Sequence, residues 1–195
     1  MSRRSSSPSS GSAATLILAS RSPQRRAILT QLGVEFEVVV PDVEEVEEGE
    51  PGALVVENAL RKVRAVSGDL VLGVDTTVVV DGRSYGKPGN EEEARTVLSL
   101  LSGRVHEVWS GLALRERGDE RTATAVTSVR FRELDDELLR WYLASGEWRE
   151  RAGGYAIQGR GAALVESIDG DFWNVVGLPV PALLDLAPDL LKGQI

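Results

Sequence analysis

The sequence contains no cysteine and only one histidine, His106, and these two absences remove several kinds of chemistry. Without cysteine the chain has no disulfide framework, no thiolate zinc site and no cysteine nucleophile. One imidazole cannot build a histidine-rich metal site. For His106 itself we favour a place in a turn or in the core over a catalytic role.

Positive charge and long apolar runs are also scarce. The chain has 22 Lys and Arg against 30 Asp and Glu, and its net charge of -8 argues against a general affinity for nucleic acid. A polyanionic ligand would therefore have to be held by a local group of cations. No apolar run reaches the ~20 residues that a membrane-spanning helix needs, and the opening segment lacks the apolar core of a secretory signal. These features predict a cytoplasmic protein without a membrane contact.

The composition that remains is typical of one globular unit. Hydrophobic residues make up 42% of the 195 residues and charged residues 27%, which is enough for a real core. Single cores grow to ~250 residues before a chain divides into domains. The Ser-rich opening predicts a disordered tail over 1–15. We assign the folded domain to residues 16–191 and a short C-terminal tail to 192–195.

Helices and strands alternate along the chain without a fixed repeat. Apolar runs and alternating patterns predict strands over 16–19, 36–40, 70–80, 105–114, 122–132 and 162–168. Helical spacing and capping residues predict helices between Pro23 and Gly33 and over 51–66, 90–101, 135–145 and 179–191. Asp81 and Gly82 predict a hairpin turn. The alternation predicts the α/β class, with a mixed sheet.

Two segments that follow strands have both a functional and a structural interpretation. Residues 20–26 precede a helix, where free backbone amides and Arg25 would cradle a phosphate group. Ser22 acting as a simple N-cap, with solvated arginines, explains the same pattern and is favoured for this segment alone. Asp75 ends an apolar strand, where an unpaired buried charge is costly. It needs either a metal or cation partner, or a turn that it caps with its own carboxylate.

Other candidate residues are ambiguous when each is taken alone. Lys87 lies between a glycine and a proline, but the surrounding residues do not form a Walker A loop. Lys62 lies on the polar face of its helix, where lysines are more often solvated. The acidic run over 42–50 includes Glu44 and offers the oxygen ligands that Mg²⁺ prefers, although such runs are usually solvated loops. Four glycines surround Gln158, whose amide would contact a base edge or an attacking water, unless the segment is only a bulge between strands.

Taken together and in order, these pieces closely resemble the Maf family of nucleoside triphosphate pyrophosphatases. The matching segments are Leu-Ala-Ser-Arg-Ser-Pro-x-Arg (18–25) and residues 57–62, 73–76, 86–88, 101–106, 154–159 and 174–179. The resemblance covers about residues 16–191, and seven ordered matches are hard to obtain by chance. It implies a mixed, twisted central sheet with flanking helices, two lobes around a cleft, and usually a homodimer. The implied reaction is hydrolysis between the α- and β-phosphates of a nucleotide.

The resemblance also implies roles for individual residues. The triphosphate would be held by a hydroxyl and three cations, namely Ser20, Arg25, Lys62 and Lys87. Asp75 would serve as general base or metal ligand, with Glu44 as a second ligand of a divalent metal such as Mg²⁺, Mn²⁺ or Co²⁺. Gln158 would orient the water or contact the substrate, and Thr76 would contact the substrate. Lys87 and Gln158 would therefore act in catalysis together with Asp75.

The sequence departs from the family pattern at one position, and two of its segments resemble one branch of the family. Gln24 stands where many relatives have arginine, so one basic residue of the first motif is lost while Arg25 remains. The segments over 155–159 and 102–106 resemble the branch that acts on dTTP, UTP and related pyrimidine triphosphates. The alternatives are a 7-methyl-GTP pyrophosphatase and a non-catalytic nucleotide-binding protein that regulates division, because relatives have been linked to septum formation.

Overall fold

The computed structural model of the chain describes residues 15–192. The two predicted tails, 1–15 and 192–195, therefore lie almost entirely outside the described residues. Within that span, no helix combines the length and the apolar character that crossing a bilayer requires.

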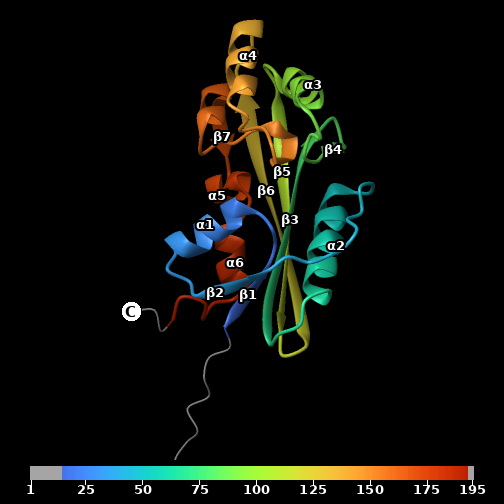
Figure 1. The fold of residues 1–195 in the computed structure, drawn as a ribbon, viewed down its shortest axis with the longest axis vertical. Helices are drawn as coiled ribbons and strands as arrows, with labels where there is room; N and C mark the ends of the chain where they lie inside the picture. The colour runs from blue at the N-terminus through green and yellow to red at the C-terminus, as the bar shows by residue number, and fades with distance from the viewer. Residues whose placement is uncertain (1–14, 193–195) are drawn as a thin grey trace, which may run out of the picture.

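One mixed sheet of seven strands runs the length of the molecule (Figure 1). The strands are β1 (Leu16–Ala19), β2 (Phe36–Val39), β3 (Leu70–Val80), β4 (Arg83–Tyr85), β5 (Val105–Glu116), β6 (Asp119–Phe131) and β7 (Val165–Asp169). Their order is β2-β1-β3-β5-β6-β7, and β4 pairs with β3 off this path. β1 is parallel to β2 and to β3, whereas the other pairs are antiparallel. The predicted α/β class with a mixed sheet is confirmed.

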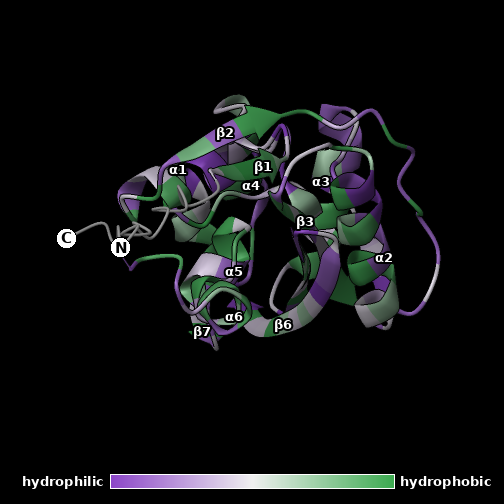
Figure 2. Ribbon diagram, turned by 90° about the horizontal axis from the view of Figure 1, so that it is seen from below, coloured by the Kyte–Doolittle hydropathy of each residue, from purple (hydrophilic) through white to green (hydrophobic). Residues whose placement is uncertain are grey.

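Helices cover both faces of this sheet (Figure 2). They are α1 (Pro23–Gln31), α2 (Pro51–Arg64), α3 (Glu91–Leu101), α4 (Asp136–Ala144), α5 (Phe172–Val176) and α6 (Val180–Leu186), with 3-10 turns at Ala152–Gly154 and Arg160–Leu164. Viewed along the molecule, α2 lies on one side of the strands and α1, α5 and α6 lie on the other. The sheet therefore separates two groups of helices. Residues from both groups can meet where strands of the sheet end.

Helix α2 packs unusually close to the sheet because two strand residues that face it have no side chain. A Cβ added at Gly73 of β3 would collide with the backbone oxygen of Ala59, and one at Gly111 of β5 would collide with the backbone of Val55. Ala59 and Val63 fill the same interface and are fully buried. This contact brings the polar side chains of α2 up against the middle of β3.

The apolar core of the described residues forms three clusters, one of which is the contact between α2 and the sheet. One cluster joins α1 and α6 to the sheet through residues such as Leu29 and Leu183. Another joins α3 and α4 to the far halves of the central strands through Leu98, Tyr142 and Phe131. A large cavity of the described chain is lined by residues from both of these parts.

Two boundaries and one short helix differ most from the prediction. The predicted strand over 162–168 begins only at Val165, because residues 160–164 form a 3-10 turn in which Gly161 packs on the backbone of Ala156. The predicted helix over 179–191 ends at Leu186, since Pro188 forces Ala187 out of the helical region, to φ -131° and ψ 71°. The five-residue helix α5 was not predicted, because so short a helix shows no periodicity.

Candidate active site

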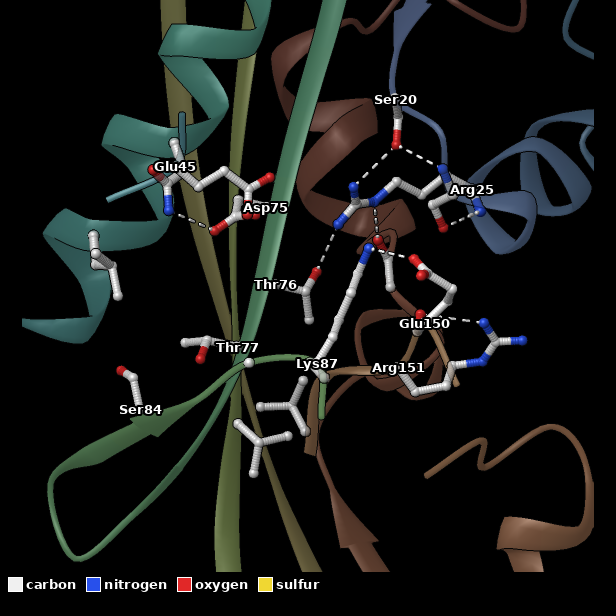
Figure 3. Close-up of a pocket in the computed structure, with 18 of the residues that line it drawn as sticks. Ser20, Arg25, Glu45, Asp75, Thr76, Thr77, Ser84, Lys87, Glu150 and Arg151 are labelled. Carbon is white, nitrogen blue, oxygen red and sulfur yellow. Dashed lines mark hydrogen bonds and ion pairs between the residues drawn. The ribbon is translucent and has the colours of Figure 1, made fainter. Parts of the chain in front are cut away.

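A cavity of about 930 Å³ lies at the carboxyl end of β1 and beside the middle of β3 (Figure 3). Its volume falls in the range of small-molecule sites. Most of the predicted site residues line it, namely Ser20, Arg25, Lys62, Asp75, Thr76 and Lys87. Residues far apart in the sequence therefore converge on one cavity, as the phosphate-binding hypothesis requires.

Arg25 is held in place from three directions. Its Nε donates to the backbone oxygen of Gly177 at 2.9 Å, and its two terminal nitrogens donate to Ser20 Oγ and Thr76 Oγ1, both at 3.1 Å. The side chain is only 9% exposed. Burial lowers the pKa of Arg25, and the nearby carboxylates of Asp75 and Glu45 oppose this change. The guanidinium is thus a fixed, charged group at the cavity wall.

The first turn of α1 explains how Arg25 comes to be there. Ser22 caps the helix by accepting from the backbone N–H of Arg25, and Pro23 occupies the first helical turn. The structural interpretation of Ser22 is therefore correct, but solvation of the arginines is wrong for Arg25. Gln24 also lines the cavity and accepts a hydrogen bond from Ser22 Oγ at 2.9 Å.

Asp75 lies on β3 and is tied to α2 by two hydrogen bonds. Its Oδ1 accepts from Lys62 Nζ at 2.6 Å, and its Oδ2 accepts from Asn58 Nδ2 at 3.1 Å. Asp75 is 8% exposed and Lys62 is 6% exposed, so this ion pair is largely shielded from water. Asp75 therefore has the cation partner that one interpretation of the sequence required. The other interpretation, that Asp75 caps a turn, is wrong because the residue lies inside a strand.

Lys62 joins this carboxylate to a second one. Its Nζ lies 2.7 Å from Glu45 Oε1, in the segment between β2 and α2, and 3.3 Å from the backbone oxygen of Val74. All three ammonium protons therefore have an acceptor in the protein. Lys62 was expected to be a phosphate ligand, but the structure shows it as the counter-ion that two carboxylates share.

Lys87 approaches from the loop that follows β4. Its Nζ pairs with Glu150 Oε2 at 3.0 Å, and both side chains are well exposed, at 49% and 65%. The pKa of Glu150 is lowered, chiefly by its hydrogen bond from Lys87. In Figure 3 the Lys87 side chain extends toward Arg25, so the two cations face a common space.

Two predicted site residues lie outside the cavity lining. The side chain of Glu44 is exposed, and its backbone oxygen accepts from Arg61 at 3.2 Å, while the neighbouring Glu45 lines the cavity instead. Gln158 is also exposed, and Tyr155 is the residue of the same segment that reaches the cavity. No contact in the structure therefore supports a metal role for Glu44 or a catalytic role for Gln158.

His106 is a core histidine, as expected. It is 2% exposed, and its Nε2 lies 2.9 Å from the Tyr155 hydroxyl. The Phe131 ring packs edge-on against it, with ring centroids 4.9 Å apart. Burial lowers the pKa of His106 to about 4, so the imidazole is neutral at neutral pH. Its contact with Tyr155 nevertheless connects it to the cavity wall.

The carboxylates that would hold a divalent metal are Asp75 and Glu45. Across residues 15–192 there is no group of three His, Cys, Asp or Glu side chains that would enclose an ion without help. Mg²⁺ and similar ions are commonly bound by one or two carboxylates, with substrate phosphates and waters completing the shell. Two carboxylates beside a cationic pocket fit that second arrangement.

The fold and the site define a class: an α/β protein with a nucleotide-sized cavity in which buried cations and carboxylates lie side by side. The comparisons with known proteins are more specific. Residues 15–190 match the family model described as Maf-like protein, and the chain belongs to the Maf family.

Several relatives are similar over most of their length. The chain is 51% identical to the dTTP/UTP pyrophosphatase of Symbiobacterium thermophilum over 171 residues, which cover 85% of this chain and 88% of that protein. It is 44% identical to the protein of that name from Dictyoglomus thermophilum over 88% of this chain and 93% of the relative. For the protein of that name from Pyrococcus furiosus, the identity is 40% over the same two shares.

Proposed function

We propose that this protein hydrolyses dTTP, UTP and related pyrimidine nucleoside triphosphates to the monophosphate and pyrophosphate. The observation that carries the proposal is the convergence of Arg25, Lys87 and the Lys62–Asp75 pair on one cavity. Membership of the Maf family and the names of relatives at 40–51% identity support the same reaction.

The phosphate chain would be held by Arg25, which has N–H groups left to donate, and by Lys87, whose ammonium becomes free when its ion pair with Glu150 opens. Arg25 is fixed against the protein, so it offers a rigid charged surface with little reorganisation. Lys87 is bound to the exposed Glu150, and such a surface pair contributes only a few tenths of a kcal/mol to about 1 kcal/mol. A triphosphate would therefore displace Glu150 at small cost and take the Lys87 ammonium.

Asp75 would act on the water that attacks the α-phosphorus, either as its base or as a ligand of the metal. A divalent ion, Mg²⁺, Mn²⁺ or Co²⁺, would neutralise the charge that develops on the phosphate oxygens. We propose Glu45 as the second carboxylate in place of Glu44, because Glu45 lies in the cavity and shares Lys62 with Asp75. Gln158 and Thr76 remain predictions, and only Thr76 lines the cavity.

The pyrimidine preference rests on two sequence segments that meet in space. Residues 102–106 end at His106, residues 155–159 begin at Tyr155, and these two side chains are hydrogen bonded. Because Tyr155 lines the cavity, both segments influence the shape of the pocket from one place. The proposed preference is supported by this contact, because it joins the two segments at the cavity wall.

A panel of pyrophosphate-release assays tests the proposal. UTP, dTTP and 7-methyl-GTP are each supplied with Mg²⁺, Mn²⁺ or Co²⁺, and with a chelator as control. We expect metal-dependent release of pyrophosphate with UTP and dTTP as the preferred substrates. A preference for 7-methyl-GTP would overturn the pyrimidine assignment. Tight nucleotide binding without release under any metal would instead favour a non-catalytic regulator.

We also propose a homodimer in the cytoplasm, where its nucleotide substrates are found. The supporting observation is β2, which forms one edge of the sheet (Figure 2). Val38, Val39 and Val40 are 38%, 40% and 51% exposed. Unprotected apolar edge strands tend to pair with another chain. Sedimentation of the wild type and of Val39→Lys tests this, and a monomeric wild type would refute the dimer.

A further inference from the structure

The acidic loop, residues 40–49, joins β2 to α2 and forms neither helix nor strand. It borders the cavity and carries Glu45. None of its backbone groups makes a backbone hydrogen bond to another described residue. Side chains must therefore determine where this loop lies and where Glu45 points.

Helix α2 supplies those side chains from adjacent positions. Asn58, Arg61 and Lys62 lie three and four residues apart and so project from neighbouring positions on the helix surface. Arg61 donates to the Glu44 backbone oxygen at 3.2 Å, and Lys62 pairs with the Glu45 carboxylate at 2.7 Å. One turn of helix thus binds consecutive residues of the loop.

Asn58 makes the most complete of these contacts. Its Oδ1 accepts from the Val46 backbone N–H at 2.7 Å, and its Nδ2 donates to the Val46 backbone oxygen at 2.9 Å. The second Nδ2 proton is donated to Asp75 Oδ2 at 3.1 Å. The side chain is only 3% exposed. Both Nδ2 protons are donated and Oδ1 accepts one hydrogen bond, so the network distinguishes the two ends of the amide and fixes its orientation.

We infer that Asn58 is a positioning residue for the proposed reaction: it links the acidic loop to Asp75, so that Glu45 and Asp75 are held side by side. This inference rests on the proposed function. Asn58 lines the cavity, and its amide bridges Asp75 and Val46, the residue that follows Glu45. Its removal would leave Arg25 and Ser20 in place, since neither of them contacts α2 through a hydrogen bond in this structure.

We expect the loss of Asn58 to affect kcat much more than KM. A displacement of about 1 Å in a reacting group can cost about 100-fold in rate, whereas phosphate binding depends on other residues. Asn58→Ala should lower kcat by at least about 10-fold with dTTP, and should change KM by less than about 3-fold. A dUTP analogue with a methylene bridge between the α- and β-phosphates should bind the variant about as tightly as it binds the wild type.

A second readout does not depend on activity. The Val46 amide is protected by Asn58, so hydrogen exchange across residues 44–48 should become at least about 10-fold faster in Asn58→Ala. Asn58→Asp has the same shape but places a carboxylate against Asp75 and the Val46 oxygen, and should lose at least as much kcat. Val46→Pro removes the backbone N–H that donates to Asn58 Oδ1, on the loop side of the same link, and should also lower kcat.

Asn90→Ala is the matched control. Asn90 caps α3 through similar contacts with Glu93, and it does not line the cavity. Its loss should leave kcat and exchange in 44–48 unchanged. If the wild type is active and Asn58→Ala is equally active, the positioning role alone is overturned. The same holds if the variant raises KM but keeps the kcat of the wild type. A wild type that releases no pyrophosphate would overturn the proposed function and this inference with it.

Discussion

The ammonium of Lys62 lies 2.6 Å from Asp75 and 2.7 Å from Glu45, so one buried cation holds two carboxylates that come from different parts of the chain. Removing that cation leaves the buried Asp75 without its counter-ion, next to the like charge of Glu45, whose side chain is 53% exposed. Breaking a buried ion pair on one side typically costs about 3–5 kcal/mol. We expect Lys62→Met to lower the free energy of unfolding by about 3 kcal/mol, as measured by urea denaturation.

Lys87→Met provides the contrast for that experiment. The Lys87 pair with Glu150 is exposed, so its loss should change the free energy of unfolding by less than about 1 kcal/mol. Nucleotide affinity should fall in this variant all the same, because a cation of the cavity is lost. Equal stability losses in the two variants would show that burial of Lys62 does not matter energetically.

Asp75 is the carboxylate on which the proposed chemistry depends. Asp75→Asn keeps the shape of the side chain but removes the charge that would bind the metal or accept the proton. We expect the turnover to fall by at least about 100-fold, the lower range for the loss of a positioned base. Pyrophosphate release under saturating dTTP measures it. Turnover near that of the wild type would remove Asp75 from the mechanism.

Much of this architecture was predictable from local patterns. β3 is an almost continuous apolar run, and the long helices have apolar residues at helical spacing. The turn at Asp81 and Gly82 has positive φ at both residues, as its sequence predicts. The end of α6 was missed although Pro188 gives the signal, because the apolar spacing continues past it. Local patterns were sufficient where an element has a long apolar run or a clear apolar face.

The site was harder to predict, for two physical reasons. In a loop without periodicity nothing in the sequence tells which of two adjacent acids faces inward, so Glu44 was chosen although Glu45 lines the cavity. The direction of the glycine-rich segment is set by tertiary contacts, which place Tyr155 rather than Gln158 at the cavity. Asn58 was within a matched motif, and its place four residues before Lys62 was the available signal.

Gln24 offers a test of the phosphate-binding surface by gain of charge. Many relatives carry arginine at this position according to the sequence resemblance, and Gln24 lines the cavity one residue before Arg25. A second guanidinium there would add a cation for the phosphate chain. We expect Gln24→Arg to lower the KM for dTTP about 3-fold to 10-fold, most clearly at low ionic strength. An unchanged KM at low salt would mean that the triphosphate does not reach this wall.

His106 gives a prediction about stability at acid pH. Burial lowers its pKa in the folded protein to about 4, against 6.5 for the free side chain. The unfolded chain therefore binds a proton between these two pH values while the folded protein does not, and stability must fall as the pH drops through this window. The difference between the two pKa values corresponds to about 3 kcal/mol of stability.

Urea denaturation of the wild type and of His106→Gln between pH 7 and pH 4 isolates this contribution. Carboxylates titrate in both proteins, so they largely cancel in the difference, whereas only the wild type has the imidazole. The wild type should lose more stability than the variant as the pH falls. Parallel curves would show that His106 becomes protonated without unfolding, and hence that its contact with Tyr155 at the cavity wall opens easily to water.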